Sequence, residues 1–211
     1  MKNTQARHVR NRTSSTHRPE TPARSRDRRV QKTKASLHTA LIGLAREKPY
    51  PSIVVKEILD RANVGRSTFY THFRDKDDLL ESGIYDVLRS LQDLPRRSSA
   101  PERLVAFSLP LLRHIDEHRR TAGPRMGREG RATMHAHMED VLTTVIADQL
   151  ATAMRVSRAE TPMDLVARYV ASTFVLVLNQ WVENDTEWTP AEADARFRAL
   201  AMPTLNSLFN P

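Results

Sequence analysis

Apolar residues recur along most of the chain at the three- and four-residue spacing of an amphipathic helix. The first stripe includes Leu37, Leu41 and Leu44, and it ends at Pro49-Tyr50-Pro51, because proline has no amide hydrogen with which to continue a helix. Stripes with the same spacing follow over residues 55–62, 66–73 and 76–94. No two alternating segments are joined by a hairpin turn. The pattern therefore predicts an all-α protein.

A break in the pattern divides the helical part of the chain in two. The segment Pro95 to Pro101 is rich in proline, serine and arginine and predicts a linker. Thr161 and Thr189 each precede a proline and stand three positions before an acid, which is typical of a capped helix start. Further helices are expected over residues 102–118 with a kink at Pro110, over a stretch marked by Met134 to Leu150 that runs to about Val156, and from these two threonines onward. A loop is expected over 121–130. We expect three regions: a disordered arm at 1–28, one helical domain at 29–94 and a second at 95–211.

The positive charge is concentrated at the N-terminus. The chain has a net charge of +8, but residues 1–34 alone hold eleven Lys and Arg against two acids, so the remainder carries a net charge of −1. The arm has almost no large apolar residue and cannot bury enough surface to offset the entropy of ordering. It is either a solvated tail, or a mis-assigned start, or a basic segment that attracts the phosphates of a nucleic acid.

Several classes of protein are disfavoured by what the sequence lacks. It has no cysteine, hence no disulfide or thiolate chemistry, which fits a cytoplasmic location. Its apolar stretch from Tyr169 to Val182 contains polar residues and suits a core helix better than a membrane span. His114 and His118 share a helix face without an evident third ligand, so we expect surface histidines and no metal site. No phosphate loop, nucleophile elbow or catalytic acid pair is found, so neither an enzyme nor a cofactor is predicted.

The segment from Val54 to Phe73 has the pattern of a helix-turn-helix. A short helix is followed by Asn63-Val64-Gly65, residues suited to a tight turn, and then by a second helix. Phe69 and Phe73 lie one turn apart and are expected to face the core. The opposite face carries hydroxyl and cationic side chains instead of the Lys and Glu mixture of an ordinary surface helix. Such side chains can bind base edges and phosphates of DNA.

The residues from Ile58 to Leu80, ILDRANVGRSTFYTHFRDKDDLL, resemble the signature of the TetR family of bacterial transcription regulators. The resemblance covers about residues 33–94 and implies an N-terminal three-helix DNA-binding domain followed by a helical C-terminal domain that dimerises and often binds an effector. It implies that Phe69, Phe73 and Leu79 belong to the core and that Lys76 meets a phosphate at the start of the fourth helix. By the same resemblance, the residues that would face operator DNA are Arg66, Ser67, Thr68, Tyr70, Thr71, His72 and Lys76.

Two positions depart from the family pattern. Val54 stands where a threonine or serine usually begins the second helix, so the side-chain cap is missing and that helix start is weaker by about 1 kcal/mol. Pro49 replaces the usual glycine of the preceding turn, and Lys48-Pro49-Tyr50 resembles a subgroup with a Lys-Pro-aromatic turn. Neither change touches the face that would read DNA.

The C-terminal half resembles the family only through its helix order. Apolar residues surround the helix from Thr161, which fits either a homodimer interface or the core of a single chain. The family resemblance and a few polar residues on apolar helices suggest a pocket for a small-molecule effector, with Met134, Met138, Tyr169, Asn179 and Trp181 as its candidate residues. We expect a homodimeric, ligand-responsive repressor that binds operator DNA and has no membrane partner. The alternative is a helical adaptor or nucleoid-type protein that binds DNA without sequence preference.

Overall fold

The computed structural model describes residues 22–90, 99–121, 127–153, 162–183 and 186–209. Within these ranges every regular element is a helix, which confirms the all-α prediction. The elements are α1 (Pro22–Glu47), the 3-10 helix η1 (Tyr50–Ser52), α2 (Val55–Ala62), α3 (Arg66–His72), α4 (Lys76–Ser90), α5 (Ala100–Val105), α6 (Ser108–Thr121), α7 (Arg128–Ala153), α8 (Met163–Glu183) and α9 (Pro190–Phe209).

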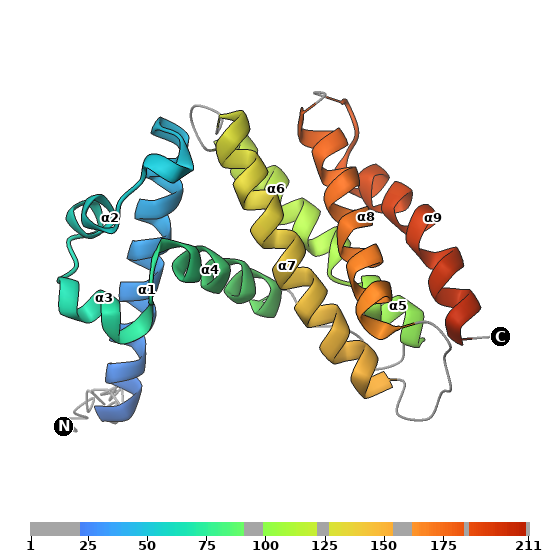
Figure 1. Cartoon of the computed structure of the whole chain (residues 1–211), viewed down its shortest axis with the longest axis horizontal. Coiled ribbons are helices and arrows are strands. Elements are labelled where there is room, and N and C mark those ends of the chain that lie inside the picture. Colours follow the sequence, from blue (N-terminus) through green and yellow to red (C-terminus); the bar gives the residue numbers. More distant parts are fainter. Residues whose placement is uncertain (1–21, 91–98, 122–126, 154–161, 184–185, 210–211) are drawn as a thin grey trace, which may run out of the picture.

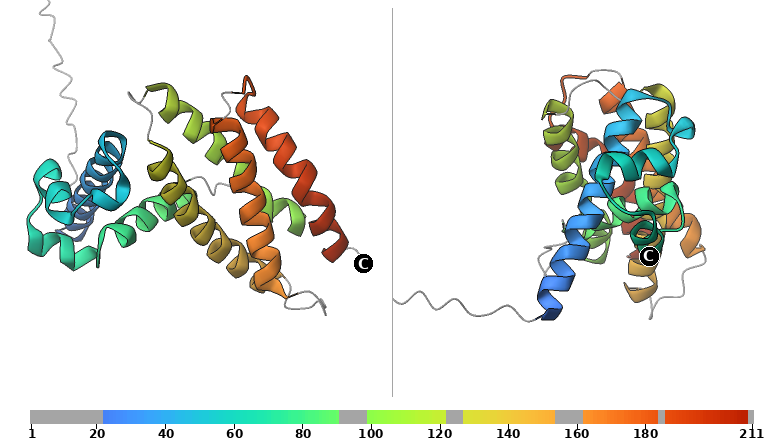
Figure 2. Two further views of the ribbon diagram at one scale, coloured as in Figure 1. Left: turned by 45° about the horizontal axis from the view of Figure 1, so that its top comes forward. Right: turned by 90° about the vertical axis from the view of Figure 1, so that its left-hand side faces the viewer.

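The helices form a small N-terminal head and a larger C-terminal bundle (Figure 1). In the head, α1 packs on α2 and α4, and α3 packs on α2. In the bundle, α7, α8 and α9 run side by side with alternating direction, while α5 and α6 pack against α9 (Figures 1 and 2). The two parts meet where α4 and η1 pack on α7. The helix-turn-helix therefore lies at the end of the molecule far from the C-terminus.

The predicted apolar stripe of α1 is the centre of the head. Leu37 and Leu41 are almost fully buried, and Ile58 of α2 and Phe69 of α3 are buried with them. Burying side chains of this size stabilises the fold by about 1.5 to 3 kcal/mol each. The buried apolar residues of the head and of the bundle belong to one connected cluster.

Three helical segments differ from those expected. α1 begins at Pro22, inside the segment predicted to be a disordered arm; residues 1–21 lie outside the described part. The helix expected over 102–118 is two helices, because the chain turns at Ala106 and Phe107. Pro110 does not kink a helix there, since it lies in the first turn of α6, where amide hydrogens have no partner within the helix. α7 begins at Arg128, within the loop predicted over 121–130. The linker predicted from Pro95 to Pro101 lies partly outside the described residues.

The expected start of α9 is confirmed in detail. The Thr189 hydroxyl accepts from the amide of Glu192 at 3.2 Å, and the Glu192 carboxylate accepts from the amide of Thr189 at 2.8 Å. These reciprocal bonds satisfy two amide hydrogens at the helix end, and the bond to the Thr189 amide lowers the pKa of Glu192. Thr161, the corresponding residue before α8, lies outside the described residues.

One described helix, α8, is long and apolar enough over Met163–Val182 to cross a membrane, with a mean hydropathy of 1.3. Within that stretch, 56% is buried in the protein. α8 packs between α7 and α9 (Figure 1). It is a helix of the bundle core, and its length and composition alone are weak evidence for a membrane span.

Candidate nucleic-acid interface

The turn between α2 and α3 depends on Asn63. This residue ends α2 with φ 53°, the left-handed conformation that asparagine tolerates better than most residues. The amide of Val64 then donates to the Leu59 carbonyl at 3.1 Å and closes the turn. Gly65 has φ −68° and only precedes α3 as its N-cap residue. The positive φ of the turn thus falls on the asparagine, not on the glycine.

The inner face of α3 is fixed by aromatic packing. Phe69 has 0% exposure and Phe73 has 4%, and their ring centroids are 5.6 Å apart. Leu79 of α4, with 0% exposure, belongs to the same core. These three side chains orient a helix of only two turns, so its opposite face is presented in a defined direction.

The outer face of α3 is polar and open to solvent. Tyr70 is 49% exposed, and the guanidinium carbon of Arg66 lies 5.6 Å from the centroid of its ring. Thr71 is also exposed, and its hydroxyl donates to the Ser67 carbonyl at 2.9 Å, which leaves its oxygen as an acceptor. Of the seven residues predicted to face DNA, five are exposed and two are half-buried: Arg66, Ser67, Thr68, Tyr70 and Thr71 in the first group, His72 and Lys76 in the second.

Lys76 makes a different contact from the one expected. Its ammonium group donates to the carbonyl oxygens of Tyr50, Pro51 and Ile53 at 3.0, 3.3 and 3.1 Å. It also lies 4.7 Å from the centroid of the Tyr50 ring. An ammonium group has three hydrogens, so in this conformation none is left for a phosphate. Lys76 instead ties the start of α4 to η1.

The start of α2 is stabilised by Glu57 in place of a side-chain cap. Val54 is 54% exposed and makes no side-chain cap bond, as expected. The Glu57 carboxylate accepts from the Val54 amide at 3.0 Å and from the Lys48 ammonium group at 2.5 Å. These bonds, first the one from Lys48, lower the pKa of Glu57. They hold the end of α1 and the start of α2 together.

The candidate effector residues are not all brought together. Glu139 of α7 binds Ser172 of α8, so the antiparallel register places Met134 and Met138 beside the second half of α8, which includes Asn179. The Asn179 carbonyl oxygen is buried and accepts no hydrogen bond within the described residues. Tyr169 instead faces α9, where its hydroxyl donates to the Leu200 carbonyl at 3.0 Å. It lies about 15 Å along α8 from Asn179, at 1.5 Å per residue.

Trp181 is a core residue. It has 0% exposure, and its indole nitrogen donates to the Trp188 carbonyl at 2.8 Å. The indole N–H therefore has its hydrogen-bond acceptor within the chain. Among the candidate effector residues, this leaves the Asn179 carbonyl oxygen as a group that could accept a hydrogen bond from a ligand.

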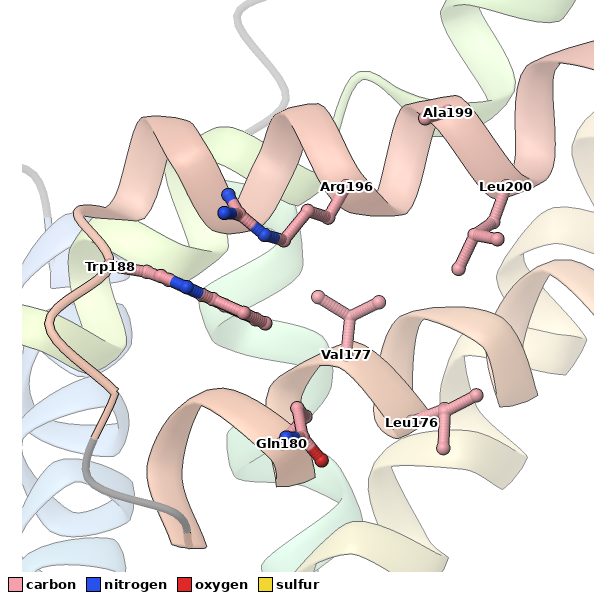
Figure 3. Close-up of a pocket in the computed structure, with 7 residues that line it drawn as sticks. All are labelled: Leu176, Val177, Gln180, Trp188, Arg196, Ala199 and Leu200. Atoms are coloured by element: carbon pink, nitrogen blue, oxygen red, sulfur yellow. The ribbon is translucent and has the colours of Figure 1, made fainter.

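The bundle carries a groove that the sequence did not predict. It lies between α8 and α9, has a volume of about 470 Å³ and is mostly apolar (Figure 3). Leu176 and Leu200 line it and are 63% and 50% exposed. Near the start of α9, the Arg196 guanidinium carbon lies 4.0 Å from the centroid of the Trp188 ring. In the sequence, the only indication of such a groove is that apolar residues surround α8 on all sides, so that one apolar face can remain exposed.

These features define a DNA-binding protein of the helix-turn-helix class, with a core-anchored second helix and an exposed polar face. The family model described as "Bacterial regulatory proteins, tetR family" matches residues 39–82, and one described as "Transcriptional regulator C-terminal region" matches residues 102–202. The chain belongs to the TetR family of bacterial transcription regulators.

Individual relatives agree with this assignment. The HTH-type transcriptional regulator YxbF of Bacillus subtilis is 33% identical over 84 residues, 39% of this chain and 21% of that one. A regulator of Mycobacterium tuberculosis is 34% identical over 73 residues, 35% of this chain and 34% of the relative. The chain thus matches only about a fifth to a third of the length of these relatives. All of the relatives mentioned are bacterial.

Solved structures share the fold over a greater length. A TetR regulator from Streptococcus agalactiae has a TM-score of 0.50 and 24% identity, with 85% of this chain and 98% of that chain covered. A TetR-family regulator from Syntrophomonas wolfei has a TM-score of 0.54 and 16% identity, with 85% and 96% covered. Head and bundle together therefore have the fold of this family.

Proposed function

We propose that the chain is a homodimeric repressor that binds a specific operator and releases it in response to a small-molecule effector, in the cytoplasm. The observation that carries the proposal is the exposed, hydroxyl-rich and cationic face of α3 opposite the buried Phe69 and Phe73. A helix so oriented fits the major groove, where side chains distinguish all four base pairs.

Each part of that face has a distinct chemical role in the proposal. The Arg66 guanidinium group can donate two hydrogen bonds to guanine or to a phosphate. Thr68 and Tyr70 offer hydroxyl groups that donate and accept, and Tyr70 also offers an apolar ring edge for a thymine methyl group. Ser67, Thr71 and His72 complete the contact. Lys76 does not take part directly but stabilises this part of the head through its hydrogen bonds to the carbonyls of Tyr50 and Ile53.

The proposed dimer forms through α8 and α9. Exposed large apolar residues of the bundle fall on these two helices, namely Leu165, Tyr169, Leu176 and Leu200. Such a contiguous apolar surface is unusual on a monomer and favours an interface. A two-fold dimer also presents two copies of α3 to a palindromic operator, as readers of this class do.

The proposed effector acts in the bundle. Its site is inferred from the buried, unsatisfied carbonyl oxygen of Asn179 beside the methionine-bearing face of α7, because a ligand donor there would satisfy that oxygen. A ligand that binds the DNA-incompetent arrangement tenfold more tightly supplies about 1.4 kcal/mol toward release.

The decisive experiment is a selection of bound fragments from random-sequence DNA by the full-length protein. We expect a palindromic consensus whose preference over random DNA persists as salt is raised, because base contacts do not depend on counterion release. Binding that is uniform across sequences and lost in salt would favour the nucleoid-type alternative. A reporter gene placed behind the selected operator should be expressed less when the protein is present; increased expression would identify an activator.

The dimer is tested by charge substitution on the apolar face. Leu176→Glu combined with Leu200→Glu should yield monomers in sedimentation equilibrium while the helical content is kept, because both side chains are already exposed in one chain. Val54→Glu is the matched control, since Val54 is equally exposed but lies in the head. A double variant that remains dimeric would place the interface elsewhere.

A further inference from the structure

The contact between the bundle and the head contains a histidine between two carboxylates. His137 of α7 has Nδ1 3.1 Å from Glu81 Oε1 and Nε2 3.8 Å from Asp77 Oδ1. Asp77 and Glu81 stand one turn apart on α4, so both face the same side. The His137 side chain is 19% exposed. One imidazole of the bundle thus faces two acids of the head.

Tyr50 links the same carboxylate to η1. Its hydroxyl donates to Asp77 Oδ1 at 2.6 Å, and its ring centroid lies 6.3 Å from that of His137. Burial, with the neighbouring Asp77, raises the pKa of Tyr50 far above its ordinary value, so the hydroxyl remains a donor. The Asp77 carboxylate therefore accepts the hydrogen bond from Tyr50 and faces His137 with the same oxygen.

From Tyr50 the contacts continue to the helix-turn-helix. The Lys76 ammonium group donates to the carbonyls of Tyr50 and Ile53. Ile53 is buried and is separated from α2 by a single residue. A continuous set of polar contacts therefore joins α7 to the start of the scaffold helix that orients α3.

The charge of His137 changes how many of these contacts can form. An imidazolium carries a hydrogen on each ring nitrogen and can donate toward both carboxylates at once. A neutral imidazole carries one hydrogen, so one carboxylate faces a lone pair and repels it. Protonation therefore adds an attractive contact between α4 and α7 and removes a repulsive one.

We propose that His137 is a positioning residue that sets the orientation of the head relative to the bundle, and that the head is held more rigidly when the imidazole is protonated. The orientation itself does not depend on the proposed function, whereas its consequence for operator binding does. The charged or titratable groups around His137 in this contact are Asp77 and Glu81 from α4, Tyr50 from η1 with Lys76 behind it, and Asp140 one turn along α7.

The test measures the distance between head and bundle. The chain has no cysteine, so Lys56→Cys on α2 and Asp148→Cys on α7, both at exposed positions, give two specific sites for spin labels. Doubly labelled protein is diluted into a large excess of unlabelled protein, so that pulsed electron resonance reports distances within one chain. Distance distributions are compared at about pH 5.5 and about pH 8, the range in which imidazoles titrate.

The expected result is a narrow distribution at the lower pH and a broader one at the higher pH. His137→Gln should be broad at both, because its amide can donate but carries no charge. His137→Arg should be narrow at both, because its cation is permanent. His135→Gln is the matched control and should behave as the unsubstituted chain, since a residue two positions away points to another side of α7.

Three results would overturn the proposal. These are a distribution of the unsubstituted chain that does not change with pH, a His137→Gln variant that keeps the full pH response, and a folded His137→Arg variant as broad as the glutamine variant. Thermal unfolding of each variant establishes that it is folded. If the DNA selection yields no operator, the proposed function fails, but the distance measurement still decides this inference.

If an operator is found, the affinity of the protein for it should also depend on the protonation of His137. His137→Gln should reduce the change in operator Kd between the two pH values at least about fivefold, the lower end of the coupling typically measured between sites. An unchanged pH dependence of Kd alongside pH-dependent distances would show that DNA binds both orientations equally, and would limit His137 to a role in the free protein.

Discussion

Tyr70→Ala tests the reading face of α3 most directly. Tyr70 is 49% exposed and contacts the Phe69 ring edge-on, with centroids 5.2 Å apart. A fully buried aromatic side chain removes about 150 to 250 Å² from water, so truncation here forfeits roughly 100 Å², or about 2.5 kcal/mol at most. The higher helix propensity of alanine returns about 0.5 kcal/mol.

This cost is small enough to separate folding from binding. A domain with about 5 kcal/mol of stability that loses about 2 kcal/mol remains more than about 99% folded. Loss of contacts to base edges should meanwhile cost about 1 to 3 kcal/mol of operator affinity, or about 5- to 150-fold in Kd. A reduced affinity could then not be attributed to unfolded protein.

The assay is fluorescence anisotropy with labelled operator at one fixed salt concentration, paired with thermal unfolding. Tyr70→Phe keeps the ring beneath Arg66 but removes the hydroxyl, so it should lose less affinity than Tyr70→Ala. Phe69→Ala, which empties a site with 0% exposure, should instead destabilise the fold by about 3 to 5 kcal/mol. A folded Tyr70→Ala variant with unchanged affinity would refute the assignment of this face to DNA.

Three further predictions concern stability and the N-terminus. Burial lowers the pKa of His38, so the unfolded chain binds the proton more readily, and stability should fall as the pH drops below about 6.5. His38→Gln should make the unfolding free energy less dependent on pH in this range. An equal slope of unfolding free energy against pH in both proteins would contradict this. Asn63→Val should cost about 1 to 2 kcal/mol in chemical denaturation because of the positive φ, whereas Gly65→Ala should change stability little, since its added carbon would lie 3.9 Å from the nearest atom outside its neighbours. Deleting residues 2–21, which leaves α1 complete, should weaken binding to all DNA and lower the slope of log K against log salt by about 0.9 per lost phosphate contact; lost preference for the operator would instead identify a base-reading arm.

The head could be predicted largely from the sequence because its signals are local. Phe69 and Phe73 at a spacing of four predict a buried face, and the structure buries both. Asn63-Val64-Gly65 predicts a turn, but composition alone does not say which residue takes the positive φ. The early start of α1 at Pro22 was missed because its first turns carry charged residues without an apolar stripe, and periodicity detects only helices with a buried face.

The contacts between distant segments could not be predicted. His137 meets Glu81 across 56 positions of sequence, and no local pattern records such a pair. The same holds for Lys76, whose bonds to carbonyls 23 to 26 positions earlier leave no donor for the expected phosphate contact. Tyr169 and Asn179 share one apolar helix in the sequence, but the side-chain direction of Tyr169 is decided by α9.

The connected cluster of buried residues has a thermodynamic consequence. Since the apolar contacts continue from the head into the bundle, the two parts should melt in a single cooperative transition, detectable as equal calorimetric and van't Hoff enthalpies. A compound bound only to the bundle at 100 times its Kd would then stabilise the helix-turn-helix by the same roughly 2.7 kcal/mol. A thermal-shift screen of candidate metabolites can therefore find effectors before any operator is known.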